Sequence, residues 1–238
     1  MKKPKYKRIL LKVSGEAMKG GRDYGIDPEY VFYLAKEIEA VYKTGAQIAI
    51  VVGGGNIFRG IAGSKRGLDR ATADYMGMLA TIFNALALQD ALEKLGLTTR
   101  LQTAIEMKQI AEMFVRRKAL RHLEKGRIVI LGGGTGLPFI TTDTTAAMRC
   151  LELGCEAIFK ATKVDGVYDD DPLKNPQAKK LLTLSLDQAF KNDKIKIMDK
   201  SAIALCRDNG IHIVIFKLGQ KGNFKKAVLG EKVGTTIF

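Results

Sequence analysis

Apolar residues gather along this chain in short, unbroken runs that are bounded by glycine and charged residues. Runs without alternation, rich in β-branched residues, are typical of strands buried on both faces, as in a parallel sheet. The sequence predicts strands over residues 9–12, 48–52, 99–103, 127–131, 157–160, 212–217 and 234–237.

Between these runs, apolar positions recur at steps of three and four residues, which predicts helices. The first helix is clearly delimited, because Asp27 suits an N-cap, Pro28 suits the first helical position, and Gly45 suits the end. Further helices are predicted over residues 69–95, 104–125, 141–153, 185–192 and 199–208. The stretch 69–95 is apolar nearly all round, which is typical of a helix in the core or in a subunit contact.

Strands that alternate with helices predict a three-layer α/β/α fold with a mostly parallel central sheet. No linker divides the chain, so residues 1–238 are expected to form a single domain. The stretch 162–175 is rich in Asp, Gly and Pro, and long loops of this kind in compact domains are often functional.

Composition narrows the functional classes. The chain has 238 residues and a net charge of +14, which fits nucleic acid or a polyanionic small substrate such as a nucleotide. No aromatic-interleaved basic stripe accompanies the charge, so nucleic-acid binding is not expected. Cys150, Cys155 and Cys206 form no CxxC pair, so neither disulfides nor a zinc site is predicted. No apolar run approaches the roughly 20 residues of a membrane span and no cleavage site follows the basic start, so we expect a cytoplasmic protein.

Glycine loops follow two of the predicted strands. Gly53–Gly55 comes directly after strand 48–52 and is followed by Arg59, and Gly132–Gly136 follows strand 127–131. Ligands bind at the carboxyl ends of strands in such sheets, and glycine lets backbone amides approach an anion. One such loop could serve only a tight turn, but two loops, together with Lys12 and Lys160 at the ends of two more strands, favour phosphate binding.

Several familiar chemistries lack their motifs. The P-loop pattern GxxxxGK[ST] does not occur, and neither glycine loop has the third glycine of a dinucleotide fingerprint. His122 and His212 are the only histidines, and both favour structural roles. Transfer of a phosphoryl group onto a phosphate needs no strong base, because an acceptor phosphate with a second pKa of roughly 6 is already ionised.

Five motifs now carry a family resemblance. They are KVSGEA from Lys12, GGGNIFRG from Gly53, DYMGMLAT from Asp74, TGLPFITTD from Thr135 and KATKVDGVY from Lys160. In order and spacing they resemble the bacterial uridylate (UMP) kinases, a family with the amino-acid kinase fold. The resemblance implies transfer of the γ-phosphoryl group of MgATP to UMP, giving UDP and ADP. It also implies that the N-terminal half binds the acceptor and the C-terminal half binds ATP.

The resemblance assigns roles to particular residues. Lys12, Arg59 and Asp143 would be catalytic: Lys12 would neutralise the phosphoryl group in flight, and Asp143 would orient Lys12 or the Mg²⁺ shell. The residues implied for ATP are Lys12, Val13, Ser14, Gly15, Gly55, Arg59, Thr162, Tyr168 and Asp171. The residues implied for UMP are Gly54, Asp74, Thr135, Gly136, Leu137, Pro138, Phe139, Ile140, Thr141 and Thr142. The residues alone leave alternatives open: Asp143 could equally be the cap of its helix, and Asp74 could be a carboxylate on a helix surface. For Lys160 and Asp199 a structural role is favoured.

Two positions depart from the family pattern. Leu137 stands where the family commonly has Asn, and Ile140 stands where an aromatic residue is usual. Since a leucine side chain forms no hydrogen bond with a base edge, uracil selectivity is in question here, whereas phosphate and ribose binding are not.

Cofactor, assembly and regulation also follow from the resemblance alone. Mg²⁺ would be bound mainly through the ATP phosphates, with no protein metal site. The assembly would be a homohexamer built from dimers that pack through the helix over 69–95. GTP and UTP would be effectors, and the loop expected to take part is Gly20, Gly21, Arg22, Asp23, Tyr24 and Gly25. The alternatives are another phosphotransferase of this fold, such as a carbamate or amino-acid kinase, and a nucleic-acid-binding regulator.

Overall fold

The structure of the chain, a computed structural model, describes residues 2–60, 67–170, 175, 177–192, 195 and 197–238. Within them, nine strands form one sheet in the order β4-β3-β5-β2-β1-β6-β10-β11-β9. These strands are β1 (Arg8–Val13), β2 (Gln47–Val52), β3 (Thr99–Thr103), β4 (Glu112–Met113), β5 (Ile128–Gly132), β6 (Ala157–Thr162), β9 (Thr183–Leu184), β10 (His212–Lys217) and β11 (Thr235–Ile237). Neighbouring strands are parallel except where β10 meets β11. A separate antiparallel pair is formed by β7 (Val167–Tyr168) and β8 (Lys180–Leu181).

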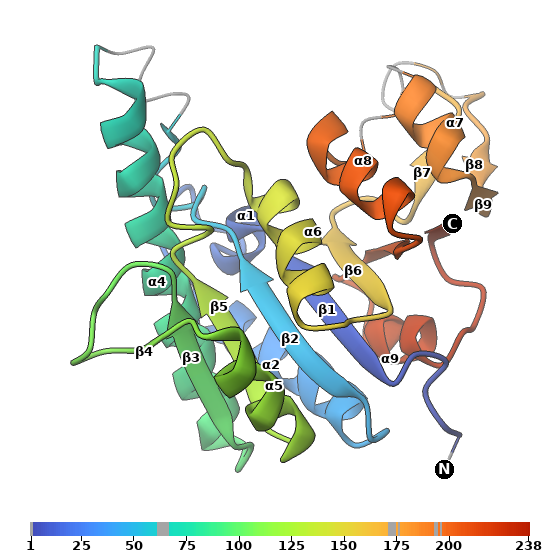
Figure 1. The fold of residues 1–238 in the computed structure, drawn as a ribbon. Coiled ribbons are helices and arrows are strands. Elements are labelled where there is room, and N and C mark those ends of the chain that lie inside the picture. Colours follow the sequence, from blue (N-terminus) through green and yellow to red (C-terminus); the bar gives the residue numbers. More distant parts are fainter. Residues whose placement is uncertain (1, 61–66, 171–174, 176, 193–194, 196) are drawn as a thin grey trace.

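Helices cover both faces of the sheet and give the three layers predicted from the sequence (Figure 1). They are α1 (Gly15–Met18), α2 (Pro28–Tyr42), α4 (Arg70–Lys94), α5 (Arg116–Glu124), α6 (Thr142–Glu152), α7 (Leu186–Lys191), α8 (Lys200–Asp208) and α9 (Asn223–Val228). One apolar core lies between the sheet and α2, α4 and α9, and the other lies between the sheet and α5, α6, α7 and α8.

The alternation of side chains along β1 decides which face its polar residue occupies. Ile9 and Leu11 pack into the core under α2, whereas Leu10 packs into the core under α6. Successive residues of a strand point to opposite faces, so Lys12 lies on the same face as Leu10. By the same rule, Lys160 on β6 shares the face of Ile158, and Lys12 and Lys160 are register partners. Both lysines are therefore directed toward α6.

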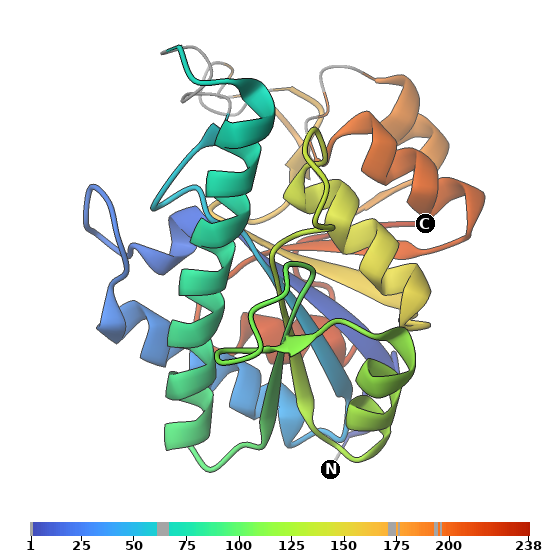
Figure 2. The same ribbon diagram turned by 60° about the vertical axis from the view of Figure 1, so that its left-hand side comes forward.

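The boundaries of two helices match their sequence signals. Asp27 caps α2 by accepting hydrogen bonds from the amides of Glu29 and Tyr30, and Asp69 caps α4 by accepting from Thr72. Figure 2 shows α4 as a long helix that runs along the sheet. Its exposed apolar side chains are Tyr75, Met76, Leu79 and Phe83. No helix in the described part of the chain is long and apolar enough to cross a membrane.

All seven predicted strands are present, and the differences concern short elements. The helix predicted over 104–125 was wrong in its first half, because β4 extends the sheet there and α5 begins only at Arg116. The expected loop after β1 contains the single-turn helix α1, and α9 was not predicted because six residues are too short to show a periodicity.

Candidate functional site

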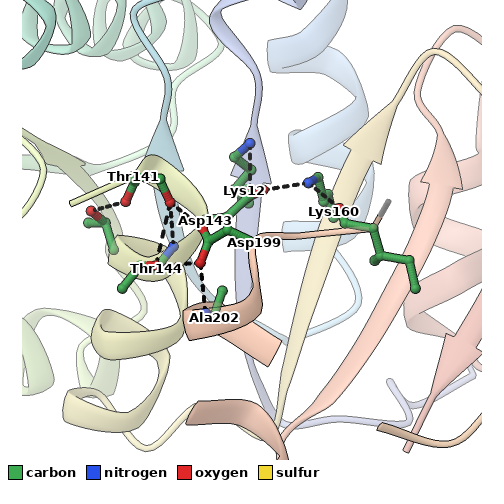
Figure 3. Close-up of polar contacts among 9 residues, drawn as sticks. Lys12, Thr141, Asp143, Thr144, Lys160, Asp199 and Ala202 are labelled. Carbon is green, nitrogen blue, oxygen red and sulfur yellow. Dashed lines mark hydrogen bonds and ion pairs between the residues drawn. The ribbon is translucent and has the colours of Figure 1, made fainter. Parts of the chain in front are cut away.

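A buried carboxylate lies between two lysines at the carboxyl ends of the central strands. Asp143 Oδ1 is 2.8 Å from Lys12 Nζ, and Asp143 Oδ2 accepts a hydrogen bond from Lys160 Nζ at 2.7 Å (Figure 3). The side chains of the three residues are only 10 to 17% exposed. Separating the partners of a buried ion pair would leave an uncompensated charge away from water. The three side chains are therefore held close together.

The electrostatics of this group keep Asp143 ionised. Burial tends to raise the pKa of Asp143, but the charges of Lys12 and Lys160 together outweigh it and lower the pKa below its usual 3.8. Burial is also the largest influence on Lys160 and, with the nearby charge of Lys12, lowers its pKa below the usual 10.5 despite Asp143. The group therefore combines two lysine side chains with a single carboxylate.

The N-terminus of α6 fixes the position of Asp143. Thr141, rather than Asp143, is the N-cap, and its hydroxyl accepts from Thr144 N at 3.1 Å. Asp199 caps α8 and also accepts hydrogen bonds from the Thr141 and Thr144 hydroxyls, the latter at 2.8 Å (Figure 3). Asp199 therefore ties α8 to the first turn of α6, the turn that carries Asp143.

The glycine loop after β2 packs closely against its neighbours. A Cβ atom on Gly54 would lie 2.8 Å from the Ala80 side chain and the Gly77 carbonyl oxygen of α4. A Cβ atom on Gly15 would lie 2.6 Å from the Gly55 amide nitrogen. A Cβ atom on Gly55, in contrast, would meet nothing closer than 3.7 Å. Gly15 and Gly54 are thus required for packing, whereas Gly55 has space in front of it.

Two buried amide side chains hold the same loop in place. Asn84 of α4 donates to Gly53 O at 2.7 Å and to Asn56 Oδ1 at 2.7 Å. Asn56 in turn donates to Gly25 O at 2.7 Å and accepts from Gly25 N through its own carbonyl at 2.9 Å. The glycine loop, α4 and the end of the Gly20–Gly25 loop are therefore joined by one hydrogen-bond network.

Arg59 follows the loop and is held by a carboxylate. Its guanidinium pairs with Glu16 of α1, and its Nε donates to Gly55 O at 3.3 Å. The hydrogen bond from Arg59 is the main reason that the pKa of Glu16 lies below its usual 4.5. The Arg59 side chain is 62% exposed, so an anionic ligand can reach it from solvent.

A cavity of about 650 Å³ opens at the carboxyl ends of β1, β6 and β10; we call it the larger cavity. Its lining includes Lys12, Ser14, Arg59, Lys160 and Thr162. The residues Lys163, Lys217, Leu218 and Gly219 form another part of the wall. Its size and its many cations suit a ligand with several negative charges.

A second cavity, of about 240 Å³, lies between α4, the glycine loop and the start of α6; we call it the smaller cavity. Its lining includes Gly54, Gly55, Asp74, Thr141 and Thr142. Asp74 Oδ2 accepts from Arg70 Nε at 2.9 Å and from the Phe139 amide at 2.8 Å. Phe139 has a φ of 67°, a strained value for a residue with a side chain. The hydrogen bond from its amide to Asp74 stabilises this backbone conformation.

Some of the residues implied for nucleotide binding line these two cavities, and others do not. Among the UMP set, Ile140 lines the smaller cavity with Thr141 and Thr142, whereas Leu137 and Phe139 are mostly exposed. Among the ATP set, Tyr168 bonds to Asp165 and does not line the larger cavity, and Gly55 lines the smaller one. The residues that border neither cavity are Val13, Gly15, Thr135, Gly136, Leu137, Pro138, Phe139 and Tyr168. Asp171 lies outside the described residues.

Sequence reasoning did not assign several residues of these walls. Arg70 could have been suspected from its spacing of four residues before Asp74, which brings the two onto one helix face. Lys163 and Lys217 carried no comparable signal, because they sit in segments rich in lysine. Of the proposed effector loop, Gly20 borders the larger cavity and Tyr24 is 81% exposed.

Comparison with known proteins agrees with this geometry. Residues 7–217 match the model of the amino acid kinase family. The chain belongs to this family.

Three solved structures of kinases are similar to this chain along nearly its whole length. The UMP kinase from Bacillus anthracis is 38% identical with a TM-score of 0.94, over 98% of this chain and 96% of that one. The UMP kinase from Ureaplasma parvum is 34% identical with a TM-score of 0.91, over 100% and 99% of the two chains. The uridylate kinase from Archaeoglobus fulgidus is 28% identical with a TM-score of 0.75, over 97% and 99%.

Proposed function

We propose that this protein is a UMP kinase, which transfers the γ-phosphoryl group of ATP to UMP and releases UDP and ADP. The observation that carries the proposal is the buried group of Lys12, Asp143 and Lys160 beside two adjoining cavities. The similarity to UMP kinases along nearly the whole chain supports the choice of substrates.

In this proposal the larger cavity binds ATP and the smaller cavity binds UMP. Lys12, oriented by Asp143, neutralises charge on the phosphoryl group during transfer, when that charge spreads over its oxygens. Arg59 exchanges Glu16 for phosphate oxygens, which its planar guanidinium binds in pairs. Gly55, which has no side chain and whose Cβ direction is not blocked, lets a phosphate approach the backbone of the loop closely.

Asp74 is proposed to accept hydrogen bonds from the ribose hydroxyls of UMP. Its position in the wall of the smaller cavity, held by Arg70 and the Phe139 amide, supports this role. The acceptor phosphate is already ionised near neutral pH, so the chemistry rests on positioning and positive charge. Neither cavity has a histidine among its lining residues, which agrees with a reaction that needs no strong base.

Mg²⁺ is proposed to enter with ATP, bound through the triphosphate. The described residues contain no group of three or more His, Cys, Asp or Glu that could hold a metal ion. Both oxygens of Asp143 contact lysine ammonium groups, so Asp143 suits orientation of Lys12 better than direct coordination. When bound, Mg²⁺ supplies further neutralisation of the phosphate oxygens.

We also propose a homohexamer built from dimers that pack through α4, with GTP and UTP as effectors that act through the Gly20–Gly25 loop. The exposed apolar side chains of α4 support the dimer, and the hydrogen bonds from Asn56 to Gly25 support a link between that loop and the glycine loop. Residues 1–238 are proposed to act as one domain in the cytoplasm, where its cysteines, all three buried and free, would stay reduced.

The experiment that tests the function compares UMP, CMP and glutamate as acceptors with MgATP, with ADP release as the readout. We expect rapid turnover with UMP and little with glutamate. Strong turnover of glutamate and none of UMP would point to an amino-acid kinase and refute the proposal.

A further inference from the structure

Some of the cations that line the larger cavity are paired with a carboxylate of the protein, and others are not. Five lining residues are cations, namely Lys12, Arg59, Lys160, Lys163 and Lys217, and the only acid among the lining residues is Glu16. Lys12 and Lys160 pair with Asp143, and Arg59 pairs with Glu16. These three cations already have carboxylate partners in the protein.

Lys163 and Lys217 differ from them. Within the described residues, neither ammonium group has a carboxylate within ion-pairing distance, and neither donates a hydrogen bond. Cations that line a cavity without a partner are available to an anionic ligand and raise its local concentration.

The two unpaired lysines are not held equally well. Lys163 is exposed and lies in a bend directly after β6. Lys217 is half-buried and is the last residue of β10, where it is the register partner of Thr162 on β6. A group on a strand end loses less conformational freedom on binding a ligand than one on an exposed bend.

The segment that follows Lys217 is also anchored. Asn223 of α9 donates to Lys217 O at 3.2 Å, and Tyr33 of α2 donates to Leu218 O at 2.8 Å. The buried carboxylate of Glu37 accepts from Gly222 N, with both oxygens at 2.9 Å. Residues 217–222 are therefore tied at both ends to the helices behind the sheet, which fixes this wall of the larger cavity.

The position of Lys217 relative to the reacting centre decides which phosphates it can serve. Lys160, which contacts Asp143, is the register partner of Ile215, so Lys217 lies two residues farther along the neighbouring strand. Strand β10 also lies on the side of β6 that faces away from β1 and Lys12. Lys217 is thus on the outer part of the cavity, away from the phosphoryl group that is transferred.

We propose that Lys217 binds the phosphates of the donor nucleotide that remain on the leaving nucleoside diphosphate. This inference rests on the proposed function, because it takes the larger cavity as the donor site. The contact forms equally with ATP and with ADP, so it contributes to binding of the donor and not specifically to the transition state.

The test is Lys217→Gln, which removes the charge and keeps most of the side chain. Since a charge-assisted contact to phosphate is lost, we expect KM for ATP and Kd for ADP to rise about tenfold. We expect kcat, KM for UMP and Kd for adenosine to change less than about twofold, because the transferred group, the acceptor and the nucleoside do not touch Lys217. ADP and adenosine binding are measured by calorimetry, and the rates by ADP release.

Two matched variants separate the contact from general effects of charge and folding. Lys221→Gln makes the same change on the same segment at an exposed position that does not line the cavity, and it should leave every constant within about twofold. Lys217→Arg keeps the charge and should restore Kd for ADP to within about threefold of the original protein. A merely structural role would weaken adenosine as much as ADP.

The inference is overturned if Lys217→Gln and Lys221→Gln bind ADP equally well, or if Lys217→Gln weakens ADP and adenosine to the same extent. Its failure is separate from failure of the proposed function. Turnover of UMP by the unmodified protein tests the function, whereas the ratio of ADP to adenosine affinity tests Lys217 even without any turnover.

Discussion

Arg59 lines the larger cavity and donates a hydrogen bond to Gly55, which lines the smaller one, yet the two cavities use charge in opposite ways. The larger cavity has five cations and one acid among its lining residues. The smaller cavity has one of each, Arg70 and Asp74, which are paired with one another at 2.9 Å. The rest of its polar lining consists mainly of threonines and glycine backbone.

This difference matches the two nucleotides that we propose for the cavities. A triphosphate needs several positive charges in excess, since each unpaired charge raises its affinity. A monophosphate with a sugar and a base is recognised mainly by directed hydrogen bonds, which paired charges and threonine hydroxyls provide. The reacting phosphates would meet where the two environments touch, beside Lys12.

The largest effect is expected at the group of Lys12, Asp143 and Lys160. Lys12→Ala and Asp143→Ala should each lower kcat by roughly 1000-fold, because the first removes the cation that neutralises the phosphoryl group and the second removes the carboxylate that orients this cation. Steady-state rates with saturating ATP and UMP measure the loss, and the oligomer mass by light scattering shows whether assembly persists. A near-normal rate in either variant would refute the role given to that residue.

A change confined to the smaller cavity should affect only the acceptor. Asp74→Asn keeps one carbonyl oxygen for the Phe139 amide but removes the charge, and we expect KM for UMP to rise roughly tenfold to a hundredfold. KM for ATP should stay within about twofold. Initial rates over a grid of both substrates measure the two constants, and equal rises in both would show that the cavities do not act separately.

The glycines at the border allow a contrast between packing and ligand access. Gly55→Ala adds a methyl group that meets Arg59 and Glu16 only at ordinary contact distances of 3.7 Å or more, so we expect an unchanged melting temperature. Because the methyl group stands where a phosphate would approach, we expect a roughly tenfold lower kcat/KM. Gly54→Ala forces its methyl group against α4 and should destabilise the fold by about 1–3 kcal/mol.

Calorimetry and rate measurements on the two glycine variants separate these effects. If Gly55→Ala melted as early as Gly54→Ala, the open space in front of Gly55 would be in doubt.

The smallest effect concerns pH. Because burial lowers the pKa of Lys160 below 10.5, its positive charge is lost as pH rises through that lowered pKa. The rate should therefore decline on the alkaline side, and Lys160→Arg, whose guanidinium keeps its charge, should move this decline to higher pH by about one unit. An identical alkaline limb in both proteins would exclude Lys160 as its cause.

The sequence predicted the sheet well because buried parallel strands leave a simple signature. It also pointed to Lys12, Gly55, Arg59 and Asp143 as candidate site residues, because their motifs are local, and their roles stay a prediction. The pairing of Asp143 with Lys12 was expected from the family resemblance. The pairings of Lys160 with Asp143 and of Arg59 with Glu16 were not predicted, because each joins elements far apart in the chain.

Glycine is the clearest example of what a pattern leaves open. Gly54 and Gly55 are neighbours in one motif, but only the packing of α4 shows that Gly54 is required for close approach, whereas Gly55 has room for a methyl group. Lys217 could not be singled out for a related reason. Several lysines lie between residues 217 and 226, and only the fold shows that Lys217, at the end of its strand, lines a cavity.

The most direct test of the account is a crystal structure of the protein with UMP and ADP bound together. The account predicts ADP in the larger cavity, with its phosphates near Lys217, and UMP in the smaller cavity, with its ribose hydroxyls on Asp74. The UMP phosphate should lie beside Gly54 and Gly55, and the uracil edge near Leu137 would show what replaces an amide contact there. UMP bound in the larger cavity, or two nucleotides whose phosphates do not meet near Lys12, would contradict it.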